Sequence, residues 1–178
     1  MEQSRENVSA LCNAERNSYV RQRITESLLA LLEERPLQEV SISELCAKAQ
    51  VGRVSFYRNF ESKEDVLKCR IRWLMDEFGY PGSEQDDRTF EEIITALFSH
   101  MDEHREFYGL LHRRGLSHLL KEALVEQLGI DFDGPAIEAY AKGFVVYHLY
   151  GWMEVWFERG MRESPREIEQ LLILSHEQ

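Results

Sequence analysis

The chain has 178 residues, of which 43% are hydrophobic and 30% charged, and its formal net charge is −11. This composition excludes a disordered or fibrous protein, and the length allows one good-sized core or a small domain joined to a larger one. The charge is unevenly distributed, because residues 16–72 hold 11 basic and 8 acidic residues while the rest of the chain holds 10 and 24. A basic N-terminal third on an acidic remainder is typical of a nucleic-acid-binding domain attached to a solvated body.

The cysteines and the apolar runs bear on the location of the protein. Cys12, Cys46 and Cys69 have no metal-ligand spacing, and the last two lie among apolar helical positions. They predict buried thiols and a reducing, cytoplasmic location. The N-terminal segment has no apolar secretion signal, and the most apolar run, GFVVYHLYGWMEVWF, is too short to span a bilayer. We therefore expect no membrane partner.

Apolar residues recur at helical spacing through almost the whole chain, and no alternating strand pattern is present. The sequence therefore predicts an all-α protein. A polar arm, residues 1–17, precedes a first helix that ends at Pro36. A second, short helix opens with Ser41 and has Glu44 three residues later, which is the pattern of a capping box. A break at Gln50 ends this helix.

The segment after this break, VGRVSFYRNF, predicts a third short helix, Arg53–Phe60. Two short helices joined by a tight turn, with another helix packed across them, form a helix-turn-helix, whose second helix presents its N-terminal half to the major groove of DNA. Arg53 can reach a guanine edge or a phosphate, and Tyr57 a phosphate oxygen. Phe56 and Phe60 are expected to point inward. From the residues alone, a solvated helix face is the simpler explanation of the basic positions.

The rest of the chain predicts a helical body. A connecting helix spans residues 63–78, and the loop GYPGS at 79–83 is the best candidate boundary between the two parts. The last helix opens with Ser164 and Pro165, and Glu167 completes a capping box. Between the loop at 79–83 and this last helix we expect four further helices, at residues 88–104, 105–114, 117–129 and 136–160.

The helix-turn-helix segment of the sequence resembles a known family. The string SISELCAKAQVGRVSFYRNFESKEDVL is similar to the DNA-binding signature of TetR-type transcriptional regulators. The matching positions keep their spacing across three helices: Arg53, Ser55, Phe56, Tyr57, Phe60, Lys63, Glu64 and Leu67. A looser similarity connects the C-terminal part to a subgroup that includes dihydroxyacetone-kinase-type regulators, through Gly143, Trp156, Gly160, Ser164 and Pro165.

The resemblance implies a helix-turn-helix DNA-binding domain at residues 18–62 and a helical regulatory and dimerisation domain at 63–178. It also implies a set of DNA-binding residues, namely Ser41, Gly52, Arg53, Val54, Ser55, Tyr57, Arg58, Asn59 and Lys63. Lys63 is expected to contact a phosphate from the first turn of its helix.

The chain leaves the family pattern at the turn. Gln50 stands where the family usually has glycine, and a left-handed turn there would be strained by a Cβ atom. Gly52 stands where an Asn, Ser or Thr usually caps the recognition helix, so a side-chain cap is lost. We expect both departures to tune affinity or turn geometry without abolishing DNA binding.

Two sets of residues in the body have predicted roles. One set predicts an effector pocket between helices, lined by His112, Tyr140, Phe144, Tyr147 and His148. These side chains could equally well belong to the core, with their polar atoms hydrogen-bonded. The last two helices carry more apolar surface than one small body covers, which predicts a homodimer interface of Trp152, Val155, Trp156, Ile168, Leu171 and Leu172. The alternative is that these residues only close the core of the body.

The segment HMDEH, His100–His104, matches a zinc-peptidase motif, but no partner segment accompanies it and a charged helix end explains it more simply. No catalytic residues, metal or cofactor are therefore expected. The sequence predicts a homodimeric, non-enzymatic regulator that binds double-stranded DNA, a repressor of a quasi-palindromic operator that a small-molecule effector relieves. The alternative is a DNA-binding adaptor or activator controlled by a partner protein.

Overall fold

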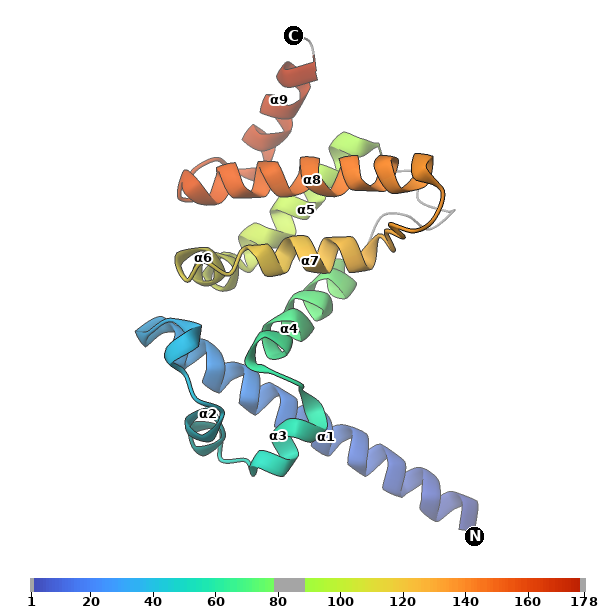
Figure 1. Ribbon diagram of the computed structural model, residues 1–178, viewed down its shortest axis with the longest axis vertical. Helices are drawn as coiled ribbons and strands as arrows, with labels where there is room; N and C mark the ends of the chain where they lie inside the picture. Colours follow the sequence, from blue (N-terminus) through green and yellow to red (C-terminus); the bar gives the residue numbers. More distant parts are fainter. Residues whose placement is uncertain (1, 79–88, 177–178) are drawn as a thin grey trace. The chain divides into compact units, whose positions relative to one another are not determined.

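The computed structural model describes the backbone of residues 2–78 and 89–176, with side chains for residues 18–78, 89 and 92–174. Within these ranges the chain forms nine α-helices and one short 3-10 turn, and no strand (Figure 1). The all-α prediction is confirmed. The loop predicted at residues 79–83 lies outside the described residues. None of the described helices combines the length and the apolar character that crossing a bilayer requires.

The chain divides into two compact units, residues 1–70 and 71–178. We call them the head and the body. The division falls inside one helix, α4 (Lys63–Phe78), whose first half belongs to the head and whose second half belongs to the body.

The head contains α1 (Glu2–Glu34), the 3-10 turn η1 (Leu37–Glu39), α2 (Ile42–Ala49) and α3 (Arg53–Asn59). Helix α1 begins 16 residues before the predicted helix, because residues 2–17 contain neither proline nor glycine and are rich in helix-forming types. The polar arm of the sequence-based prediction is therefore helical backbone.

The core of the head is built from one buried face of each helix. Phe56 of α3 is completely buried, and α3 packs against α1 and α2. Burying a side chain of this size stabilises a fold by about 1.5–3 kcal/mol. The other completely buried members are Ile24, Leu28, Leu32, Leu45, Val66 and Leu67.

The body contains α5 (Phe90–Glu103), α6 (Arg105–Arg113), α7 (His118–Gln127), α8 (Ala136–Glu158) and α9 (Pro165–His176). Helix α5 packs against α9, and α7 lies along α8 (Figure 1). Trp156 of α8 is 1% exposed, and its ring meets Phe98 of α5 edge-on at 5.2 Å between centroids.

The two predicted capping boxes differ in the structure. At α9 the box is complete, because Ser164 N donates to the Glu167 carboxylate at 2.8 Å and Glu167 N donates to Ser164 Oγ at 3.4 Å. At α2 only half of it forms. Glu44 N donates to Ser41 Oγ at 3.2 Å, whereas the Glu44 carboxylate pairs with Arg35, the residue after the end of α1. This ion pair has replaced the second bond of the box.

Candidate nucleic-acid interface

The turn between α2 and α3 has the left-handed backbone that the sequence predicts. Gln50 adopts φ 57° and ψ 41°. Its N–H donates to Ala47 O at 3.1 Å, and Val51 N donates to Cys46 O at 3.0 Å, which together form a Schellman motif at the end of α2. A side chain in this conformation costs about 1–2 kcal/mol relative to ordinary helical backbone. Because this residue is glutamine and not glycine, its backbone is strained.

Arg23 of α1 supports the strained turn. Its Nη2 donates to Gln50 Oε1 at 3.1 Å, and its Nε donates to Ala49 O at 3.4 Å. The cation also lies at the C-terminus of α2, where the helix dipole favours positive charge. Arg23 thus joins α1 to the turn through the side chain that glycine would lack. Sequence reasoning missed this residue, because the contact spans 27 positions and no local pattern signals it.

The N-terminus of α3 lacks a side-chain cap, as the sequence predicts. Gly52 is the N-cap residue, with φ −75° and ψ 149°, a conformation open to any residue. A Cβ atom placed on Gly52 would meet no described heavy atom within 4 Å. Neither the backbone nor the surrounding space therefore requires glycine here.

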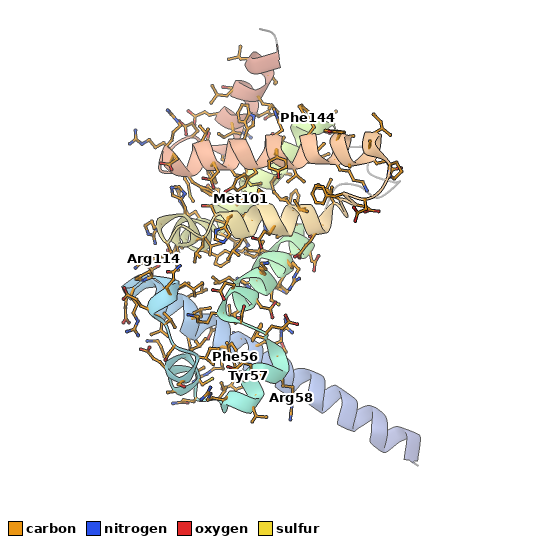
Figure 2. All side chains as sticks on the ribbon, viewed as in Figure 1. Phe56, Tyr57, Arg58, Met101, Arg114 and Phe144 are labelled. Atoms are coloured by element: carbon orange, nitrogen blue, oxygen red, sulfur yellow. The ribbon has the colours of Figure 1, made fainter. Side chains whose placement is uncertain are left out.

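Helix α3 has one buried side and one exposed side. Phe56 is 0% exposed and Phe60 at the end of the helix is 3% exposed, which confirms that both point inward. Val54 and Tyr57 lie on the opposite side and are 73% and 52% exposed. Figure 2 labels Phe56, Tyr57 and Arg58 along this short helix. Tyr57 is thus a surface residue and not part of the core.

The polar residues predicted for DNA binding fall into two groups. Arg53 and Arg58 are exposed on α3 beside Val54 and Tyr57, and we call these four residues the α3 surface. The second group makes bonds within the head. Asn59 Nδ2 donates to Ser55 O at 2.8 Å, and Ser41 Oγ caps α2.

Lys63 also has partners inside the head. Its ammonium donates to Leu37 O and Val40 O, both at 2.6 Å, and so holds the turn η1 that connects α1 to α2. The structure gives Lys63 a structural role in addition to the predicted phosphate contact, which stays a prediction. Removing its ammonium is expected to loosen the head as well as to change DNA binding.

A buried thiol lies behind the α3 surface. Cys46 of α2 is 3% exposed, as predicted. Burial raises the pKa of the Cys46 thiol, and the positive charge of Arg53 acts in the opposite direction. The thiol is therefore protonated and unreactive at neutral pH. Cys69, also predicted to be buried, is only half-buried.

The residues predicted for an effector pocket do not enclose one. Tyr140, Phe144 and Tyr147 of α8 are 80%, 71% and 56% exposed. His148 is half-buried and stacks on Phe144, with centroids 5.6 Å apart. His112 of α6 is also half-buried, and its ring packs on Phe157. In the single chain these five residues do not close around a space, because α8 turns the three aromatic side chains outward, and the effector pocket stays a prediction.

A small cavity lies elsewhere in the body. Its volume is about 10 Å³, roughly the room that one water molecule needs. It lies between the end of α4 and helices α5 to α8. Its lining residues are Met75, Phe78, Leu97, His100, Met101, Tyr108, Leu120 and Met153. None of the five predicted pocket residues lines it.

The predicted dimer interface divides between core and surface. Trp156, Ile168 and Leu172 are at most 4% exposed, so they close the core of the body and cannot contact a second chain. The indole of Trp156 is held further by a hydrogen bond from Nε1 to Glu163 O at 3.0 Å. For these three residues the interface prediction is wrong. Ile168 and Leu172 lie on α9, which packs on α5, and the ring of Trp156 packs on Phe98 of α5. Val155 and Leu171 are 60% and 46% exposed, and Trp152 is half-buried.

The exposed side of α8 is apolar along most of its length. The first four of its large side chains recur every three or four residues, the spacing that places residues on one side of a helix, and the fifth follows eight residues later, beyond Gly151. We call them the α8 stripe: Ile137, Tyr140, Phe144, Tyr147 and Val155. Contiguous apolar surface of this kind marks an interaction site in a soluble protein.

A helix-turn-helix head with an exposed second helix, followed by a separate helical body, defines the class of helix-turn-helix regulators. Residues 24–68 match the family model for bacterial regulatory proteins of the tetR family, and residues 88–176 match the model for a transcriptional regulator C-terminal region. The chain therefore belongs to the TetR family of bacterial transcriptional regulators. The similarity to the dihydroxyacetone-kinase-type subgroup stays a prediction.

Two curated relatives are similar in sequence. The uncharacterized HTH-type transcriptional regulator YxbF of Bacillus subtilis (strain 168) is 25% identical over 161 residues, which is 83% of this chain and 42% of that protein. The nucleoid occlusion factor SlmA of Idiomarina loihiensis is 35% identical over 75 residues, 36% of this chain and 38% of that protein. The chain spans about two fifths of the length of these relatives.

Solved structures show the same fold. A TetR transcriptional regulator from Streptococcus agalactiae 2603V superposes with a TM-score of 0.56 at 19% identity, over 91% of this chain and 96% of that chain. The fatty acid degradation regulator FadR from Bacillus halodurans gives a TM-score of 0.50 at 16% identity, over 85% and 93% of the two chains. At these identities the likeness concerns the fold alone.

Proposed function

We propose that this protein is a homodimeric repressor that binds a quasi-palindromic DNA operator through α3. The observation that carries the proposal is the α3 surface: two arginines, a valine and a tyrosine exposed on a helix that Phe56 anchors, in the head of a TetR-family chain. A rigidly anchored helix with exposed basic and aromatic side chains is what major-groove recognition requires.

The residues of the α3 surface have different roles. Arg53 stands at the first position of α3, where the recognition helix approaches the base edges, and its guanidinium can bind guanine bidentately. The methyl groups of Val54 can contact the methyl group of a thymine. Tyr57 and Arg58 reach phosphate oxygens, which position the protein without reading sequence.

The α8 stripe supports dimerisation. A symmetric dimer places the same surface of both chains in contact, so an apolar stripe on one long helix would be covered by its own copy. Leu171 and Leu174 of α9, 46% and 56% exposed, extend the apolar surface available to a second chain. A dimer also supplies the two heads that a palindromic operator needs.

The regulator has no enzymatic role in this proposal and works in the cytoplasm, where the chromosome lies. An effector relieves repression by binding more tightly to the conformation that cannot bind the operator. The predicted pocket residues do not carry this part of the proposal, because three of them lie on the α8 stripe.

Selection of bound sequences from a random DNA pool tests the proposal. The expected result is one quasi-palindromic motif whose half-sites are separated by a helical turn or a multiple of it. Arg53→Ala should relax the preference at one position of each half-site and weaken specific binding by about 1–3 kcal/mol. Recovery of no enriched sequence, at a salt concentration where basic proteins still bind DNA, would show that the proposed function is wrong.

A further inference from the structure

Three metal-binding side chains meet between two helices of the body. His112 lies near the end of α6, and Glu154 and Glu158 lie one turn apart on α8. One donor atom of each lies within 4.8 Å of the donor atoms of the other two. Nε2 of His112 is 4.0 Å from a carboxylate oxygen of Glu158.

The imidazole of His112 is held in place by its other nitrogen. Nδ1 lies 3.3 Å from the hydroxyl oxygen of Ser117, a polar residue that is only 7% exposed. The ring also packs against Phe157, with centroids 5.5 Å apart. With its proton on Nδ1, the ring donates to Ser117 and leaves the lone pair of Nε2 for a ligand on the side of the glutamates. An outer hydrogen bond of this kind orients metal-ligating histidines in proteins.

Glu154 contributes an oxygen that lacks a partner. Its Oε1 is shielded from solvent and has no hydrogen-bond partner among the described residues. A shielded carboxylate oxygen without a partner is unfavourable, and a bound cation would remove this cost. The hydroxyl of Tyr150 makes a hydrogen bond with Glu154. This hydrogen bond helps to hold the carboxylate in place.

We propose that His112, Glu154 and Glu158 bind a divalent transition-metal ion, with Zn²⁺ the best fit. One imidazole nitrogen and two carboxylate oxygens are ligands that Zn²⁺ accepts, and three protein ligands leave a fourth position open. Bonds of about 2.0–2.2 Å around a tetrahedral ion place its donors about 3.4 Å apart. Closing the 4.0 Å gap between His112 and Glu158 needs only a side-chain rotation, since Glu158 is 75% exposed.

The ion would connect α6 to α8 and thereby favour one packing of the body. A consequence that rests on the proposed function is that this ion is the effector: binding changes the affinity of the head for its operator. By linkage, operator DNA then changes the affinity for the metal by the same factor.

Calorimetric titration of the chelator-treated full-length protein with ZnCl₂ tests the site. The expected stoichiometry is one ion per chain. Glu154→Gln, which preserves the size of the side chain, and His112→Asn should each weaken binding by about tenfold or more. Glu103→Gln is the matched control, because it removes a carboxylate from a second histidine and glutamate cluster on α5, formed with His100 and His104. It should bind Zn²⁺ as the wild type does.

The outcomes separate the site from its regulatory role. Absence of Zn²⁺ binding by the wild type overturns the site, and so does binding that survives Glu154→Gln but is lost in Glu103→Gln. Operator affinity is then measured with and without ZnCl₂. A change in the wild type that Glu154→Gln abolishes supports the effector role, whereas equal affinities overturn it. Failure to bind any operator in either metal state would overturn the proposed function, while the titration still decides the site.

Discussion

The turn of the helix-turn-helix and the helix ends of the body have the same backbone but different residues. Among the described helices, α6, α7 and α8 end with a glycine in the left-handed conformation: Gly115, Gly129 and Gly160, at φ 68°, 55° and 74°. Helix α2 ends with Gln50 at φ 57°. In all four cases the left-handed residue and the one after it make the same pair of backward hydrogen bonds.

This difference shows two ways to stabilise a left-handed residue. Glycine has no Cβ, so these three helix ends of the body avoid the strain at the left-handed position itself. After Gly160 the chain continues through a second left-handed residue, Met161, at φ 54°. The head accepts the strain and offsets it through Arg23, whose guanidinium bonds the side chain of Gln50 and the carbonyl of Ala49. The second solution couples the turn in front of the recognition helix to α1.

Gly160→Ala is expected to have the largest effect. A Cβ at this position meets no described atom within 4 Å, so the cost comes from the backbone alone. We expect a loss of about 1–2 kcal/mol in the free energy of unfolding, measured by urea denaturation. A change near zero would mean that left-handed backbone is not strained in this fold, which would remove the reason for the Arg23 contact.

Arg23→Met preserves most of the apolar stem of the side chain and removes both hydrogen bonds to the turn. We expect a loss of about 1 kcal/mol, since the bonds are only partly buried. Native-state hydrogen exchange at the amides of Gln50 and Val51 should show the loss locally. In a Gln50→Gly background the cost should be smaller, because one of the two bonds is already absent. Equal costs in the two backgrounds would contradict the coupling.

Gln50→Gly removes the strain and one of the two bonds of Arg23. The two effects oppose each other, so we expect a net gain of about 0.5–1 kcal/mol in the free energy of unfolding. Thermal unfolding followed by circular dichroism measures this gain. Destabilisation would show that the side chain of Gln50 contributes more through Arg23 than its backbone costs.

Gly52→Ser is expected to have the smallest effect. The N-cap conformation and the open space accept a serine, whose hydroxyl can accept a hydrogen bond from the first turn of α3. The expected gain is a few tenths of a kcal/mol. Paired denaturation curves of Gly52→Ser and Gly52→Ala distinguish a new cap from a general effect of adding Cβ, because alanine offers no hydroxyl.

Much of the head could be predicted from local pattern. The inward positions of Phe56 and Phe60 and the left-handed turn at Gln50 were expected from spacing and from the family resemblance, and the structure confirms them. Arg23 was missed because its partners lie 26 and 27 residues away. The bonds of Lys63 to Leu37 and Val40 were missed for the same reason, since they join positions 26 and 23 residues apart.

In the body, the sequence by itself determined the helices and their ends, because caps, glycines and helical spacing act within a few residues of each other. It did not separate the sides of α8, since this helix is apolar on nearly all of them. Only the tertiary structure decided that Trp156 is buried while its neighbour Val155 is 60% exposed. It also brought His112 beside Glu154 and Glu158. Which side of such a helix is covered depends on the packing of α5, α6, α7 and α9, and packing is a property of the whole chain.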